Sequence, residues 1–117
     1  TTAGDIPMEK DVSPSTEMRK GPAITIMDRT SIASPKLVKY LVDLAQEEKI
    51  PYQFKRSITG GTDTGVIHLH GEGIPSITVS IPCRFIHSSV SFAARDDINS
   101  TIKLLKTALN NLNKLNI

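Results

Sequence analysis

The sequence Ser76-Ile-Thr-Val-Ser-Ile-Pro-Cys-Arg-Phe-Ile-His-Ser-Ser89 decides the fold predicted for this chain. In its first half, three apolar residues alternate with polar ones at period two, a pattern typical of a β-strand: Ile77, Val79 and Ile81. Pro82 has no amide hydrogen to donate to a sheet, so we expect the strand to end there. The other elements are then placed on either side of this strand.

The residues after Pro82 are the first candidates for a functional site. A short loop is expected to carry Cys83, Arg84 and His87 just beyond the carboxyl end of the strand, where open α/β sheets place their chemistry. Two interpretations of His87 remain open. It either hydrogen-bonds to backbone in an ordinary loop, or it presents its imidazole as a functional group.

The sequence before this strand predicts a strand, a helix and a second strand. Residues 22–27 are apolar enough for a strand that is buried on both faces. Ser34 followed by Pro35 is a helix-start signature, and we expect a helix over residues 35–49. Residues 52–55 alternate apolar with polar and predict a short strand. A helix between two strands indicates a crossover between parallel strands.

A glycine-rich segment, Thr59 to Gly65, is the second candidate site. Gly60 and Gly61 permit positive φ and close backbone approach, and Thr62 or Asp63 is suited to cap a following helix. The segment is either an ordinary turn with a helix cap or a backbone cradle for a polar group of a ligand. It is not a phosphate loop, because no Lys-Ser or Lys-Thr pair follows the glycines at the required spacing.

The end of the chain predicts a scaffold helix. Residues 90–94 are expected to be extended, and Asp97 to be the N-cap of the final helix. Five apolar residues then recur at steps of four and three, which predicts a face turned toward the core: Ile98, Ile102, Leu105, Leu109 and Leu112.

The first residues resemble the end of a strand that enters a turn. Asp5, in the sequence Gly4-Asp-Ile-Pro7, either caps its own backbone or presents a carboxylate at a strand end. Residues 9–21 are expected to form a surface loop. Together the elements predict an α/β domain of about four strands and two helices, and such a sheet ordinarily needs cover on both faces. The pattern therefore indicates part of a larger unit.

Composition excludes several classes of protein. The net charge is +2, and the 14 Lys and Arg residues are scattered, so a nucleic-acid partner is not expected. No apolar run approaches the ~20 residues that span a bilayer, so no membrane partner is expected either. The single cysteine, Cys83, forms no internal disulfide and fits a reducing cytoplasm.

Several motifs, taken in order, resemble the carboxyl-terminal part of the M42 family of metallo-aminopeptidases, whose members are also labelled glucanases. They span residues 4–7, 20–29, 60–68, 73–76 and 80–88. The resemblance implies that residues 1–117 are the carboxyl-terminal part of a catalytic domain, a partial zinc-peptidase-like α/β/α sandwich with a mostly parallel sheet flanked by helices. It also implies a homo-oligomer that acts on peptides.

The resemblance assigns roles to single residues. The family uses two divalent metal ions, zinc foremost and cobalt as the other candidate, and by motif Asp5 and His87 match two of its ligands on different ions. Gly60, Gly61 and Thr62 are expected beside the substrate. Asp63 is expected either to orient this loop or to meet the substrate's amino group.

Other parts of the family's site have no counterpart in this chain. The early His, the bridging Asp and the Glu pair that supplies the general base are missing from residues 1–117. We therefore expect an aminopeptidase as the full-length protein and no activity from this chain alone. The alternative is a non-catalytic α/β domain that serves assembly or small-ligand binding.

Overall fold

The computed structural model of the protein describes residues 1–5 and 14–115. Ile6 and Pro7 of the expected amino-terminal turn, and residues 9–13 of the expected surface loop, lie outside the described residues. The expected α/β class is confirmed, with three α-helices and two small sheets in the described part of the chain.

The strands form two three-stranded sheets. In one, the order is β1-β5-β6, formed by β1 (Thr2–Ala3), β5 (Pro82–Arg84) and β6 (Phe92–Ala93). In the other, the order is β3-β2-β4, formed by β3 (Gln53–Phe54), β2 (Ala23–Thr25) and β4 (Thr78–Ser80). The β1–β5 and β2–β3 pairs are parallel, and the β5–β6 and β2–β4 pairs are antiparallel. The pairing is thus mixed, where a mostly parallel sheet was expected.

The crossover between β2 and β3 is confirmed. Helix α1 (Pro35–Glu47) connects these two parallel strands, with Ser34 at its N-cap position and proline at its first turn. The Ser34 side chain makes no capping hydrogen bond. Helix α1 therefore starts where the sequence predicts, through the fixed φ of Pro35 rather than through a side-chain cap.

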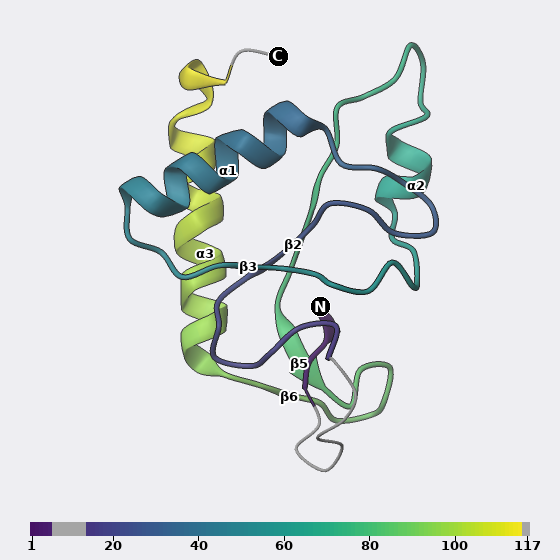
Figure 1. Cartoon of the computed structure of the whole chain (residues 1–117), viewed down its shortest axis with the longest axis vertical. Helices are drawn as coiled ribbons and strands as arrows, with labels where there is room; N and C mark the ends of the chain where they lie inside the picture. The colour runs from purple at the N-terminus through teal and green to yellow at the C-terminus, as the bar shows by residue number, and fades with distance from the viewer. Residues whose placement is uncertain (6–13, 116–117) are drawn as a thin grey trace.

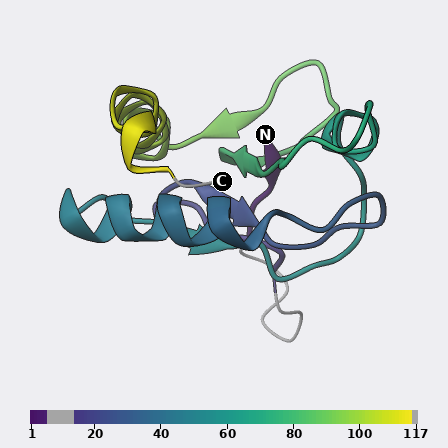
Figure 2. The same ribbon diagram turned by 90° about the horizontal axis from the view of Figure 1, so that it is seen from above.

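Helices α1 and α3 lie together at one end of the molecule, and α2 lies at the other, with the strands between them (Figures 1 and 2). Helix α3 (Arg95–Asn110) is followed by a 3₁₀ turn at Leu112–Lys114, and α2 (Thr64–Ile67) is a single turn. None of the helices in the described ranges is long and apolar enough to cross a bilayer.

The core lies where α1 and α3 meet the β3-β2-β4 sheet. Its larger cluster consists of five buried residues: Ile24, Tyr40, Leu41, Leu44 and Ala108. The hydroxyl of Tyr40 donates to the Ala108 carbonyl at 2.6 Å, so the one polar atom of this aromatic side chain is satisfied. A second cluster joins Ala45, Ile50 and Leu104. All three residues of β2 are buried, as the apolar sequence predicts.

The expectation for Pro82 is only half right. Strand β4 does end before it, at Ser80, but Pro82 opens β5 instead of a loop, and Cys83 and Arg84 lie in that strand. A proline is tolerated as the first residue of a strand because its missing N–H takes no part in the ladder. The chain passes from one sheet to the other at Ile81, and the loop begins only after Arg84.

The predicted core-facing stripe of the last helix is wrong. Its five residues are 36–68% exposed: Ile98, Ile102, Leu105, Leu109 and Leu112. The buried face of α3 carries Asp97, Thr101, Leu104 and Ala108 instead. Both sets repeat at helical spacing, but the smaller residues permit α3 to approach α1 and the sheet closely.

Asp97 is not the N-cap of α3. Ala94 holds that position, and Asp97 lies in the first turn, 1% exposed. Its carboxylate instead accepts hydrogen bonds from the backbone of a distant segment, at Arg19 and Gly21.

Candidate active site

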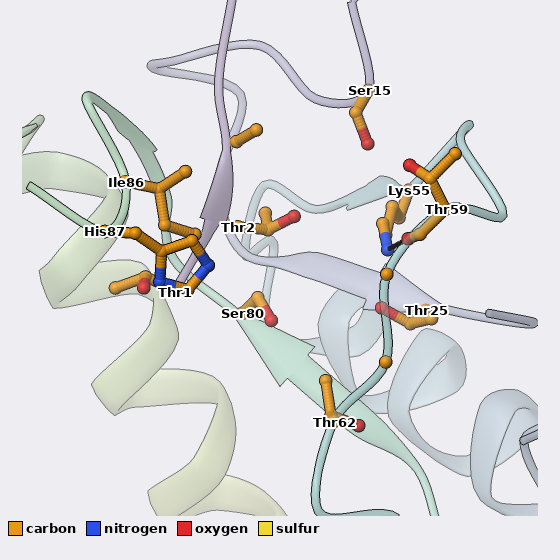
Figure 3. A pocket seen from close by; sticks show the side chains of 13 residues that line it. Thr1, Thr2, Ser15, Thr25, Lys55, Thr59, Thr62, Ser80, Ile86 and His87 are labelled. Atoms are coloured by element: carbon orange, nitrogen blue, oxygen red, sulfur yellow. Dashed lines mark hydrogen bonds between the residues drawn. The ribbon is translucent and has the colours of Figure 1, made fainter. Parts of the chain in front are cut away.

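A cavity of about 270 Å³ lies between the two sheets. Its walls are rich in hydroxyl groups and glycine: Thr1, Thr2, Ala3, Ser15, Thr25, Lys55, Thr59, Gly60, Gly61, Thr62, Ser80, Ile86 and His87. Figure 3 shows His87 and Ile86 on one side, Lys55 and Thr59 on the other, and Thr2 and Ser80 between them. Three predicted site residues, Gly60, Gly61 and Thr62, therefore face the same cavity as His87.

His87 is carried by a short loop after β5. The backbone has positive φ at Phe85 (60°) and His87 (64°), a conformation that residues other than glycine rarely adopt. The Ser88 hydroxyl donates to the Phe85 carbonyl at 2.6 Å and stabilises the turn. His87, at the second of these two unusual φ angles, lines the cavity, and backbone strain of this kind clusters at functional sites.

The glycine segment forms the opposite wall. Gly60 has φ +79°, so its conformation requires glycine. The hydroxyls of Thr62 and Thr64 lie 3.1 and 2.7 Å from the Thr78 hydroxyl of β4, which ties the segment to that sheet. Asp63 occupies the N-cap position of α2 without a side-chain cap bond, and its side chain is not among those that line the cavity.

Lys55 supplies a cationic side chain to the cavity, and sequence reasoning missed it. Its Nζ donates to the Thr59 carbonyl at 2.8 Å, which holds the ammonium beside the glycine segment (Figure 3). The sequence feature that could have identified Lys55 is its position at the end of the predicted 52–55 strand, four residues before Thr59. Parallel strands β2 and β3 end at the same edge, so Thr25 and Lys55 arrive together.

Asp5 lies at the carboxyl end of β1, next to β5, outside the set of residues that line the cavity. Its carboxylate accepts the Met18 N–H at 2.7 Å and an Arg84 guanidinium N–H at 3.2 Å. The Met18 hydrogen bond lowers the pKa of Asp5 most, with Arg84 helping against the opposing effect of burial. Asp5 is therefore ionised at neutral pH.

The donor chemistry of Asp5 and His87 fits metal ligands. They follow two adjacent parallel strands, β1 and β5. A ligand must be deprotonated to bind a metal, and the Asp5 carboxylate meets that requirement. Its oxygens retain acceptor capacity beyond the bonds to Met18 and Arg84. Within residues 1–5 and 14–115, no three His, Cys, Asp or Glu side chains gather in one place. As donor groups the two residues supply one carboxylate and one imidazole, of which the imidazole lies in the cavity lining.

The sequence profile of the M42 glutamyl aminopeptidases matches residues 1–104. The chain belongs to this family. It is 42% identical over 111 residues to an aminopeptidase homologue of Acetivibrio thermocellus, a match that covers 92% of this chain and 34% of that protein. The expected resemblance to M42 metallo-aminopeptidases is thereby confirmed.

Solved structures of two TET peptidases share the fold. A TET aminopeptidase from a marine sediment archaeon of the Thaumarchaeota superposes with a TM-score of 0.86 at 35% identity, over 94% of this chain and 31% of that one. A TET peptidase of Pyrococcus horikoshii, described as assembling into a tetrahedron or an octahedral shell, gives 0.70 at 26% identity, over 90% and 29% of the two chains. The chain thus spans about a third of the length of the relatives it matches.

Proposed function

We propose that this chain is the carboxyl-terminal part of the catalytic domain of a two-metal aminopeptidase that removes amino-terminal residues from peptides. The observation that supports the proposal is that His87 and the Gly60–Thr62 segment line the same cavity. Membership in the M42 family supports the reaction class.

Asp5 and His87 would hold the two divalent metal ions, one each, with zinc as the first candidate and cobalt as the second. Carboxylate and imidazole are common ligands of catalytic zinc. Metal ions held there would supply Lewis-acid chemistry, which polarises a carbonyl and activates a water molecule. The Met18 N–H and, after it, Arg84 lower the pKa of the Asp5 carboxyl. Arg84 also orients Asp5 through two hydrogen bonds, from Nε to its backbone carbonyl and from a terminal nitrogen to its carboxylate.

The other wall of the cavity would bind the peptide. Gly60 and Gly61 expose backbone groups without a Cβ, so a substrate main chain can approach them. Lys55 places an ammonium group in the same cavity, which complements an acidic side chain on the substrate. Asp63, outside the cavity lining, is proposed to orient the segment through its place at the start of α2.

The full site needs more groups than this chain carries. By the motif match, the general base and the remaining metal ligands belong to the rest of a family member, so we propose that residues 1–117 alone are inactive. The protein is further proposed to work in the cytoplasm, where the thiol of buried Cys83 stays reduced, and to form homo-oligomers, as the Pyrococcus horikoshii relative is described to do.

The test is a pair of histidine substitutions in the full-length protein that carries this chain. His87→Ala should remove most peptidase activity and lower the bound metal, because it deletes a ligand. His70→Ala is the control, since this exposed histidine lies away from the cavity. Metal content measured by mass spectrometry, together with release of amino-terminal residues, reads both effects.

Full activity and unchanged metal content in His87→Ala would overturn the assignment of His87. An unmodified full-length protein that binds no metal and cleaves no peptide would instead favour the non-catalytic α/β domain.

A further inference from the structure

Asp28 builds a tight turn after β2. Its Oδ1 accepts the Thr30 N–H at 2.8 Å, the Thr30 hydroxyl at 2.8 Å and the Ser31 N–H at 3.0 Å. The Asp28 N–H donates to the Ser31 carbonyl at 3.0 Å, which closes the turn. Asp28 is 7% exposed. Three of these four bonds fix the backbone of the turn, and the bond from the Thr30 hydroxyl to Asp28 fixes the orientation of the Thr30 side chain.

The Thr30 side chain lies against the glycine segment. A Cβ on Gly61 would stand 2.6 Å from Thr30 Cγ2, and one on Gly65 would stand 2.5 Å from Thr30 Cβ and Oγ1. Both positions therefore require glycine because Thr30 fills the space that a side chain would need. The Arg29 N–H also donates to the Gly60 carbonyl at 3.0 Å.

The glycine segment is thus supported at two points. Thr30 and Arg29 contact it on the side of the Asp28 turn, and Thr78 of β4 bonds to Thr62 and Thr64 at the other. The supports contact the residues that face the cavity, at Gly60 and Gly61 on one side and Thr62 on the other, so a shift of either support would move that wall.

We propose that Thr30, oriented by Asp28, is a positioning residue that sets where Gly60 and Gly61 stand in the cavity wall. Thr30 is not among the residues that line the cavity, so it acts through the glycine segment and not by touching substrate. Its kinetic consequence rests on the proposed aminopeptidase function, whereas the contact itself does not.

The geometry supplies a matched pair of variants. Gly61→Ala places a methyl group 2.6 Å from Thr30 Cγ2 and 3.1 Å from Oγ1, but 3.5 Å from Thr30 Cβ. Adding Thr30→Ala removes the two closest atoms and leaves an ordinary contact. Gly65→Ala instead meets Thr30 Cβ at 2.5 Å, an atom that Thr30→Ala retains. Thr30→Ala should therefore relieve Gly61→Ala and leave Gly65→Ala unrelieved.

Two measurements on the full-length protein that contains this chain test these expectations: enzyme kinetics and amide hydrogen exchange. Gly61→Ala should raise KM for an aminoacyl p-nitroanilide about tenfold, because small displacements of positioning groups are costly, with kcat changed less. Adding Thr30→Ala should recover the part of that loss that the clash causes, and should bring KM back to the smaller increase expected for Thr30→Ala alone, in which the glycine segment lacks the Thr30 contact. Amide hydrogen exchange at residues 60–62 should rise in Gly61→Ala and fall again in the double variant.

The proposal is overturned if Thr30→Ala fails to relieve Gly61→Ala, or if it relieves Gly65→Ala to the same extent. If the unmodified protein cleaves no aminoacyl substrate, the proposed function fails, and hydrogen exchange alone then decides whether Thr30 positions the segment.

Discussion

The carboxylate of Asp97 in α3 accepts the backbone N–H of Gly21 at 2.8 Å, across 76 residues of sequence. Its other oxygen accepts the Arg19 N–H at 2.7 Å. The approach to β2 is therefore tied to the first turn of α3. A residue that the sequence marks as a helix cap satisfies a distant loop instead.

Asp97→Ala should lower the free energy of unfolding by about 3 kcal/mol, because it leaves two backbone amides without their acceptor. Asp96→Ala is the control: it removes a charge from the same helical turn, but Asp96 is exposed. Urea denaturation of both variants measures the difference. Equal losses would mean that the helix dipole, and not the two amide bonds, accounts for the effect of Asp97.

The stability of the protein should depend on Asp28 in acid. Burial raises the pKa of Asp28, but hydrogen bonds from Thr30 and Ser31 and the charge of Lys55 outweigh it, so the pKa lies below its usual 3.8. A depressed folded-state pKa adds stability above the unfolded value, and this contribution is lost as pH falls through the folded value. The advantage of the unmodified protein over Asp28→Asn should therefore be full above about pH 5 and shrink below pH 4.

Urea denaturation of both proteins at several pH values between about 2 and 7 measures the difference in their free energies of unfolding. This pH range brackets the ordinary titration of carboxyl groups at about pH 4. A difference between the two proteins that stays constant with pH would contradict the assignment.

Lys55 should favour acidic substrates in the full-length protein. Lys55→Met is expected to lower kcat/KM about tenfold for a peptide with amino-terminal Glu, and less for one with Leu, because a charge-assisted hydrogen bond is lost. Lys36→Met, on the exposed face of α1, controls for net charge. Equal changes for both substrates would remove Lys55 from the specificity site.

This chain alone should self-associate. The exposed stripe of α3 adjoins a groove of about 340 Å³ between α1, α3 and β4, and its lining is mainly apolar, with residues such as Leu37, Val79 and Leu109. Exposed apolar surface of this kind favours association. Sedimentation at micromolar concentration should show dimers or larger species.

Ile102→Lys with Leu109→Lys should shift the chain toward monomer, since both charges fall on the stripe. Asn99→Lys with Asn110→Lys adds the same two charges at exposed positions off the stripe and should change association less. An unmodified chain that stays monomeric would show that this face needs no cover.

The extent to which the structure could be predicted differs along the chain. Local signals placed α1 at Ser34-Pro35, and the apolar run placed β2, because Pro geometry and burial on both faces leave a clear pattern. The role of α3 could not be predicted the same way. Periodicity identifies an apolar face, but which face meets the core depends on partners far away in the sequence, such as Tyr40 of α1, whose hydroxyl donates to the Ala108 carbonyl of α3.

The candidate site shows the same division. Glycine spacing and the end of a predicted strand are local signals, and they are enough to mark Gly60, Gly61 and His87 as candidates. Ser80 and Thr2 reach the cavity only through strand pairing, which sequence spacing does not encode, whereas Lys55 had a local signal in its place at the end of a predicted strand. The Pro82 error has the same cause, because whether a proline ends a strand or begins one depends on the partner strand, here β1.

The passage from β4 to β5 at Ile81 has a mechanical consequence. The cavity lies between the two sheets. One sheet contributes Thr25 and Ser80, and the other sheet and the loop after it contribute Thr2, Ala3 and His87. The width of the cavity therefore depends on how the two sheets are oriented relative to each other, and Ile81 is the residue that links β4 of one sheet to β5 of the other. A ligand bound in the cavity would contact both sheets, and it would therefore restrict their motion relative to each other.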